Sequence, residues 1–407
     1  MTNSKQKRIV VVLGMHRSGT SAITRSLGLL GIDLGDNLHP PGFDNPKGFW
    51  EDKDCLEINE QLLGYYGSAY DKLGFAWRDF DTDPFISALK LKAAQIISSR
   101  IAAYDGKWGF KDPRTCRFIR FWRSVFEICK CDVYFIIALR NPLSVALSLE
   151  ARNRIPIEKG YLLWLQHMLP AVLDSIGVPR LVVDYDLLME SPFLQVARIS
   201  SMLGLSIIDE NSLNFQDYAN NFLEKGLRHA TSSIADLQCD HRVPPDVITA
   251  YQLLLRAAKD DLPLNDESFL NFFQELNARL NAFSAVFSYI NAREDETLAL
   301  YSEIANLKYA VGERDSQIAG LTHELAAYRV QADEFARQIV GLQGELAAAQ
   351  THITHQTKEL AAYRTQADEF AHQIAGLQGK LTSDQLHITH KLRLLAAKLS
   401  QFIQGNR

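Results

Sequence analysis

The stretch Ile9–Leu30, IVVVLGMHRSGTSAITRSLGLL, decides the fold that we predict for this chain. Its first five residues, Ile9–Leu13, are an unbroken and mostly β-branched apolar run, which predicts a buried strand. From Ser21 onward the apolar residues recur at helical spacing, so a helix is predicted to follow at once. The glycine-rich loop between them can turn its backbone N–H groups inward at the positive end of the helix dipole. The stretch therefore predicts an anion-binding site.

This loop nearly matches the P-loop of nucleotide triphosphatases, G-x4-G-K-[ST], but Thr20 stands where that motif has lysine. Arg17 supplies a cation three residues earlier, and it could still reach a phosphate in the loop. The alternative is an ordinary glycine-rich turn of a doubly wound sheet. If the loop binds a phosphate ester, the expected contacts are Gly14, Ser18, Gly19, Thr20 and Ser21.

The composition is that of a globular protein, with 47% hydrophobic and 22% charged residues, and 407 residues are enough for two domains. A net charge of −5 argues against a general nucleic-acid binder. The five cysteines are odd in number and unevenly spaced, which indicates reduced thiols. No stretch approaches ~18 apolar residues, so we predict no transmembrane segment and expect the protein in the cytoplasm.

A loop rich in proline and glycine follows the first predicted helix, over residues Gly31–Asp54, and its end Asn45–Asp52 reads NPKGFWED. A loop of this length in a compact domain is usually a lid or a substrate-contacting segment. The alternative is a solvated connection whose carboxylates are merely exposed.

Two later segments are predicted to be strands that end in charged residues. The first, Lys107–Arg114, ends in the sequence K-D-P-R, and a helical pattern over residues 115–128 follows it. The second, Asp132–Leu139, is the clearest strand in the chain and leads into Arg140. Ligands of open α/β sheets bind at the carboxyl edge of the strands, so Arg140 predicts a second anion site. Polar residues then share one face of the next helix, which by itself is most often a solvated face: Asn141, Ser144, Ser148 and Arg152.

Together these motifs resemble those of sulfotransferases that use 3′-phosphoadenosine 5′-phosphosulfate (PAPS). The resemblance rests on the loop around Arg17, on Lys111–Arg114, and on Arg140 with Ser148 eight residues later. It is closest to bacterial members that open with G-M-H-R-S-G-T-S, and it extends more distantly to the carbohydrate and tyrosylprotein branches. The similarity spans roughly residues 8–230.

The resemblance implies a P-loop-like, three-layer α/β domain with a central parallel sheet that moves a sulfuryl group from PAPS to an acceptor hydroxyl. A carbohydrate or glycolipid acceptor is suggested by the relatives alone. In such a site the loop residues Ser18–Ser21 would hold the 5′ side of PAPS, and Arg140 and Ser148 would hold its 3′-phosphate. By its place in the loop, Arg17 would neutralise the charge that develops on the leaving phosphate. The resemblance gives Lys111 an assisting role, and no metal is then needed.

The acceptor hydroxyl also needs a base, and the sequence offers Glu51 and Asp112. Asp112 stands between Lys111 and Arg114, whose positive charge would make it a poorer proton acceptor and favour a structural ion pair. Glu51 follows two aromatic residues in the proline-rich loop, and apolar cover would make it a better acceptor. We therefore predict that Glu51 is the base, with Asp112 as the alternative.

Two other functional classes stay open at this stage. A P-loop nucleotide kinase or NTPase-like enzyme would use the same fold, but the lysine is missing and no magnesium carboxylate clearly follows a strand. A catalytically idle scaffold carried by the tail is the second alternative. A late basic segment, residues 225–229, resembles a nucleotide-contacting segment of the family only weakly.

The last hundred residues contain no proline and carry an apolar seam at heptad spacing, which predicts a coiled coil. The segment that begins at Glu324 returns at Glu359, 35 residues later, and five heptads preserve the seam. We therefore divide the chain into a PAPS-binding domain with a helical extension, residues 1–290, and a coiled coil, residues 291–407, that joins at least two chains. The histidine pairs of this tail lack a third ligand, so no metal site is predicted there: His352 with His355, and His387 with His390.

Overall fold

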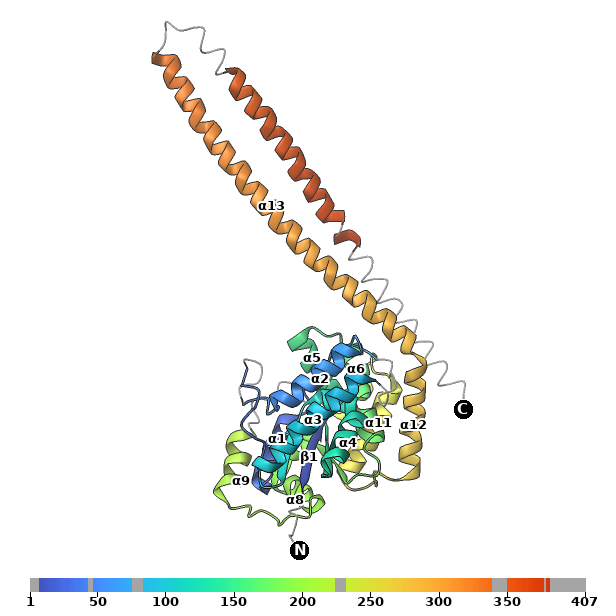
Figure 1. Cartoon of the computed structure of the whole chain (residues 1–407). Coiled ribbons are helices and arrows are strands. Elements are labelled where there is room, and N and C mark those ends of the chain that lie inside the picture. Colours follow the sequence, from blue (N-terminus) through green and yellow to red (C-terminus); the bar gives the residue numbers. More distant parts are fainter. Residues whose placement is uncertain are drawn as a thin grey trace, which may run out of the picture. The chain divides into compact units, whose positions relative to one another are not determined.

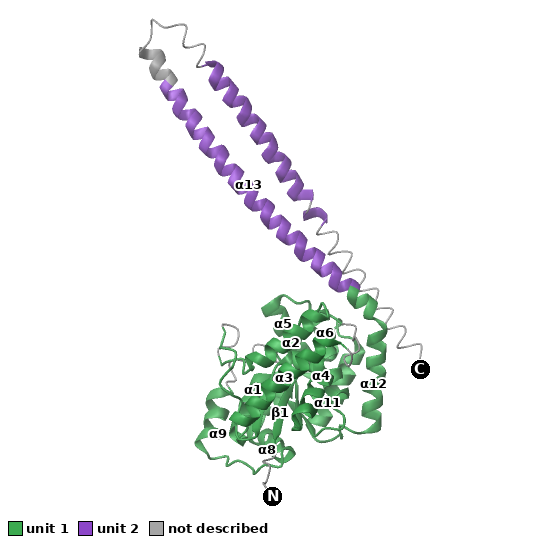
Figure 2. Ribbon diagram, in the orientation of Figure 1, with its two compact units in different colours: residues 1–288 green, residues 289–407 purple. Residues whose placement is uncertain are grey.

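The computed structural model describes residues 7–42, 47–74, 83–223, 232–338, 350–376 and 378–380. Contacts divide the chain into two compact units, residues 1–288 and 289–407 (Figure 2). The first unit is mixed α/β, and the described part of the second is helical (Figure 1).

The centre of the first unit is a four-stranded, fully parallel sheet, which confirms the predicted fold class. The strand order is β2 (Lys107–Lys111), β1 (Arg8–Leu13), β3 (Asp132–Leu139) and β4 (Arg180–Asp184). β1 is central, and it pairs with β2 on one side and with β3 on the other. Because all strands run the same way, the segments that leave β1, β2 and β3 emerge at the same edge of the sheet.

Both faces of the sheet are covered. On one face, alternate residues of β1 such as Val10 and Val12 pack in one hydrophobic cluster with Ile23 and Leu27 of α1 (Thr20–Leu27). The intervening residues of the same strand point the other way, and they are also fully buried: Ile9, Val11 and Leu13. A strand buried on both faces explains why Ile9–Leu13 is apolar without alternation.

The remaining helices of the first unit surround this sheet (Figure 1). They are α2 (Lys53–Tyr65), α3 (Pro84–Ala103), α4 (Ile119–Cys129), α5 (Pro142–Asn153), α6 (Ile157–Leu173), α7 (Tyr185–Glu190), α8 (Pro192–Met202), α9 (Leu213–Asp217), α10 (Ile234–Cys239), α11 (Pro245–Ala258) and α12 (Glu267–Ala282). Short 3₁₀ turns are η1 (Gly28–Leu30) and η2 (Pro113–Phe118), and η3 (Tyr218–Phe222) is a π turn. The helix predicted over residues 115–128 thus begins as a 3₁₀ turn, in which the Thr115 amide bonds the Asp112 carbonyl three residues earlier.

The proline-rich loop folds back on itself where the structure describes it. Leu38 and Asp52 form an antiparallel bridge, and the His39 amide donates to the Glu51 carbonyl at 2.7 Å. The Asp52 side chain then caps α2 by accepting hydrogen bonds from two of its backbone amides. These bonds fix Glu51 at the end of the loop, directly before a helix.

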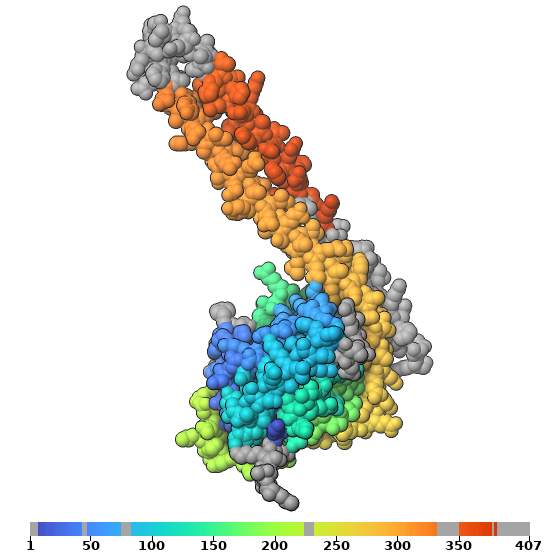
Figure 3. Space-filling view, in the orientation of Figure 1, coloured from blue at the N-terminus to red at the C-terminus, as the bar shows by residue number. Residues whose placement is uncertain are grey.

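The second unit is a helical hairpin. α13 (Ser284–Gln338) enters it, and a helix over residues 350–376 runs back alongside α13 in the opposite direction (Figure 1, Figure 3). Arg314 of α13 donates a hydrogen bond to Gln366 of the returning helix at 3.4 Å. None of the helices in the described ranges is long and apolar enough to cross a membrane.

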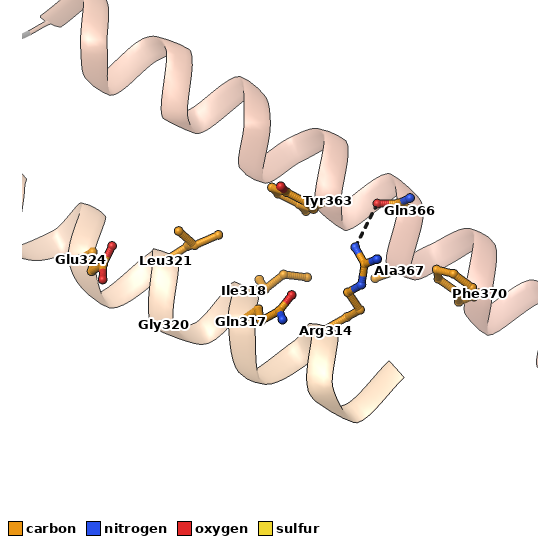
Figure 4. Close-up of a pocket in the computed structure, with 10 residues that line it drawn as sticks. All are labelled: Arg314, Gln317, Ile318, Gly320, Leu321, Glu324, Tyr363, Gln366, Ala367 and Phe370. Carbon is orange, nitrogen blue, oxygen red and sulfur yellow. Dashed lines mark hydrogen bonds between the residues drawn. The ribbon is translucent and has the colours of Figure 1, made fainter. Parts of the chain in front are cut away.

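The seam positions predicted from the heptads turn toward the opposite arm of the hairpin. Ile318 and Leu321 of α13, with Tyr363 and Phe370 of the returning helix, line a space of about 320 Å³ between the two helices (Figure 4). From Ile304 onward, the side chains that are at least partly covered recur at spacings of three, four and seven: Ile304, Leu307, Val311, Arg314, Ile318 and Leu325 on α13, and Ile353, Gln356, Leu360, Ala367, Phe370 and Ile374 on the returning helix. The seam therefore meets a segment of its own chain, and its association with a second chain stays a prediction.

Candidate active site

The loop from β1 to α1 needs backbone conformations that glycine adopts most easily. Gly14 and Gly19 have φ angles of +145° and +79°, and a Cβ atom at Gly19 would lie 2.1 Å from the Tyr185 ring. Arg17 adopts a φ of +71° although it is not glycine. Backbone strain of this kind in an ordinary residue is concentrated at functional sites, where the surrounding structure holds it in place.

Two hydroxyl side chains of this loop are buried inside it. Ser18 is fully buried, and its Oγ has no hydrogen-bond partner among the residues that the structure describes, so an unused hydroxyl is held within the loop. Thr20, which is also buried, is the first residue of α1. Backbone amides at the start of α1, the helix dipole and the hydroxyl of Ser18 together make this loop suited to an anion.

A buried cysteine thiol accepts a hydrogen bond from the β1–α1 loop. The Gly14 amide donates to Cys116 Sγ at 2.9 Å, which ties the loop to η2. Burial raises the pKa of Cys116 to about 12, so the thiol stays neutral at physiological pH. Cys116 thus acts as a structural contact of the loop.

The two anion sites predicted from sequence meet in the structure. Arg17 Nε donates to Ser148 Oγ at 2.9 Å, and Arg140 Nη1 donates to the Arg17 carbonyl at 2.8 Å. Arg140 follows β3, which is paired with β1, so the two loops emerge side by side. The sequence placed Arg17 and Ser148 at separate ends of a ligand, whereas here they touch.

Tyr185 is a site residue that the sequence analysis missed. It packs on Gly19, and the guanidinium carbon of Arg140 lies 4.8 Å from the centroid of its ring. This geometry is a cation–π contact, which holds the arginine against the loop. Tyr185 directly follows β4, and its place at the carboxyl edge of this short apolar strand was the signal that could have found it.

Glu51 and Lys111 form a buried ion pair. Lys111 Nζ lies 2.7 Å from Glu51 Oε1, and the two side chains are 3% and 9% exposed. The side chain of Glu51 is therefore covered, and a lysine that the sequence analysis did not place beside it lies within hydrogen-bond distance. The neighbouring Trp50 adopts a φ of +58° and packs against Phe222 and Arg25. The loop thereby presents the glutamate to a lysine from the end of β2.

Asp112 belongs to a buried structural network. Its carboxylate, which is 0% exposed, accepts hydrogen bonds from the Asn59 amide at 2.9 Å and from Arg114 Nη1 at 2.9 Å. Asn59 also donates to Thr115 and accepts from the Trp122 indole, both at 2.9 Å. The ion pair expected for Asp112 is therefore present, and the aspartate fixes the turn that follows Lys111.

The polar stripe on α5 has two roles, and neither is that of a solvated face. Asn141 and Ser144 hold the segment at residues 232–233, through its backbone amide and carbonyl groups. One and two turns further along, Ser148 bonds Arg17 and Arg152 lines the cavity of the site. The stripe begins as a structural contact and ends in the candidate site.

These residues surround a cavity of about 400 Å³ at the carboxyl edge of the sheet. Six of the described side chains that line it are basic, namely Arg17, Lys47, Lys111, Arg114, Arg140 and Arg152, and one, Glu51, is acidic. This excess of positive charge favours anionic ligands. His16 also lines the cavity, although the sequence analysis gave it no role.

No group of three or more histidine, cysteine or acidic side chains in the described part of the chain could hold a metal ion. Three features of the sequence analysis lie outside the described residues: the basic segment at residues 225–229, the start of the N-P-K-G-F-W-E-D segment at Asn45 and Pro46, and the pair His387 and His390.

No protein-family model matches this chain, and no curated protein matches it. Among solved structures, it is similar to the sulfotransferase domain from the Synechococcus PCC 7002 olefin synthase, with 15% identity and a TM-score of 0.34. That match covers 62% of this chain and 97% of the other. It is also similar to the sulfotransferase domain from the curacin biosynthetic pathway, with 14% identity and a TM-score of 0.33 over 67% and 99% of the two chains.

Proposed function

We propose that this chain is a PAPS-dependent sulfotransferase. The observation that supports the proposal is the contact, beside one basic cavity, of the two elements that we expect to bind phosphate: Arg17 of the β1–α1 loop is bonded to both Ser148 and Arg140. A nucleoside triphosphate needs one such element, whereas a nucleotide with a separate 3′-phosphate needs two. The loop also has Thr20 where the P-loop of nucleotide triphosphatases has lysine, which argues against a nucleoside triphosphate as the ligand.

The residues of the site fit PAPS. The orphaned hydroxyl of Ser18, the backbone of Gly19 and the start of α1 would bind the 5′ side, and Arg140 with Ser148 would bind the 3′-phosphate. Three apolar lining side chains would cover the adenine: Met189, Phe222 and Leu223. When bound, PAPS supplies the sulfuryl group together with a phosphate leaving group.

Arg17 and Lys111 would take up the charge that develops on the leaving phosphate, because both cations line the cavity. Glu51 would accept the proton of the acceptor hydroxyl. It lines the cavity, while Asp112 is sealed within its network. The acceptor that we propose, a carbohydrate or glycolipid hydroxyl, is supported by the sequence resemblance alone.

The donor assignment is tested with Arg140→Ala. If Arg140 binds the 3′-phosphate, the variant should bind 3′,5′-ADP (PAP) about tenfold or more weakly, since a charged hydrogen bond contributes ~1.5–3 kcal/mol. AMP, which lacks the 3′-phosphate, should bind the variant and the parent alike. Calorimetry of both nucleotides measures the difference, and equal losses for PAP and AMP would remove the 3′-phosphate from Arg140.

We also propose that the helical hairpin joins two or more copies of the chain. Several of its apolar side chains are still about half exposed, among them Leu321 at 42%, Tyr328 at 50% and Tyr363 at 41%. A second hairpin could cover them. Light scattering should find the full chain at twice its 45.9 kDa mass or more, and residues 1–290 as a monomer that still binds PAP. A monomeric full chain contradicts this assignment.

A further inference from the structure

His16 lines the cavity of the candidate site, and the proposed function gives it no role. It directly precedes Arg17 in the β1–α1 loop, and its ring lines the cavity that holds Glu51 and Lys111. Its Nε2 atom is buried and has no hydrogen-bond partner in the described part of the chain. A buried nitrogen with unused bonding capacity at a binding site needs an explanation.

The charged and titratable groups that the structure describes around His16 come from several elements, and most are cationic. They are Arg17 on its own loop, Lys111 at the end of β2, Arg114 on η2, Arg152 on α5, His167 on α6, Tyr70 after α2, and Glu51, which is paired with Lys111. Burial, and after it the charge of Arg114, holds the pKa of His16 well below its ordinary value. His16 is therefore neutral at physiological pH before any ligand arrives.

The second histidine, His167, offers a neutral hydrogen-bond acceptor close to His16. The ring centroids of His16 and His167 lie 6.1 Å apart, edge to face. His167 Nδ1 donates to the Leu163 carbonyl at 2.8 Å, so in the neutral ring Nε2 carries a lone pair. That atom is buried, and no described residue forms a hydrogen bond with it. Burial lowers the pKa of His167 to about 3, which keeps this ring neutral. A proton added to His16 would thus have a neutral acceptor nearby.

We propose that His16 takes up a proton when the donor nucleotide binds, and that it then acts as a cationic hydrogen-bond donor to the bound phosphates or sulfuryl group. This inference rests on the proposed function. Burial is the first cause of the low pKa of His16, and the charge of nearby cations such as Arg114 and Lys111 adds to it. An anionic nucleotide would neutralise these cations and place negative charge beside the ring, which favours the protonated form. By linkage, a ligand that favours the protonated ring must bind more tightly as the pH falls.

The test is calorimetric titration of the full chain with PAP between pH 6 and 8, in two buffers with different heats of ionisation. On binding PAP, the wild type should take up as much as about one proton more than His16→Gln. Over part of this range, the affinity of the wild type for PAP should fall by up to about tenfold for each unit by which the pH rises. In His16→Gln the extra uptake and the corresponding part of the pH dependence should vanish. The phosphates of PAP, with a second pKa near 6, contribute equally to both proteins.

His39→Gln is the matched control, because His39 also lines the cavity but lies in the exposed part of the proline-rich loop. It should keep the proton uptake of the wild type. Equal uptake by the wild type and His16→Gln overturns the inference and leaves the proposed function in place, and loss of uptake in His39→Gln alone overturns it as well. PAP that does not bind the wild type removes both proposals. If His16→Gln does not fold, histidine NMR of the wild type gives the same answer: His16 must become protonated on addition of PAP.

Discussion

Glu51→Gln should lower turnover about 10²–10⁴-fold while PAP affinity stays nearly intact, because the amide keeps the shape of the glutamate but cannot accept a proton. Rates with PAPS and an acceptor, set beside PAP binding by calorimetry, measure the effect. The side chain lines the cavity, so its loss should act on the chemical step and leave the proposed nucleotide contacts of the β1–α1 loop unchanged.

Because Glu51 is paired with Lys111, its role could instead be to hold that lysine in position, and a double variant distinguishes the two roles. If Glu51 only holds Lys111, adding Glu51→Gln to a Lys111→Met variant should cost nothing further. If Glu51 takes the proton, the double variant should be slower than Lys111→Met alone. Near-normal turnover in Glu51→Gln, together with a folded but inactive Asp112→Asn, would transfer the role of base to Asp112.

Arg17→Gln should reduce turnover about 10²–10³-fold, the usual cost of removing one preorganised group that stabilises transition-state charge. PAP binding should weaken far less, since the loop amides and Arg140 remain. Arg17→Lys keeps the charge, and it should recover part of the loss that Arg17→Gln suffers.

Ser148→Ala is the matched control for Arg17, because it removes the 2.9 Å hydrogen bond to Nε and leaves the arginine in place. It should weaken PAP binding more than it slows the chemical step. If Arg17→Gln lowers PAP affinity and turnover by the same factor, Arg17 binds the ground state and the transition state alike, and its catalytic role is refuted.

The sequence by itself determined the local structure. An apolar run of strand length, two glycines and a helical repeat specify the β1–α1 loop, because backbone conformation and the alternation of side chains depend on near neighbours. The run before Arg140 specifies β3 in the same way, and the heptads specify the long helix α13. Parallel strands then bring the loops that follow them to one edge, which is why Arg17, Lys111 and Arg140 line one cavity.

Only the tertiary structure decided which of these side chains meet. Glu51 pairs with Lys111 across 60 residues of sequence, and Arg17 bonds Ser148 across 131, because the order of the strands sets these neighbours and no local pattern encodes that order. The neutrality of His16 likewise depends on burial and on cations brought from other elements. A heptad seam determines which face of a helix must be covered by another helix. Whether its own chain or a second one covers that face is decided by the fold, since both bury the same side chains.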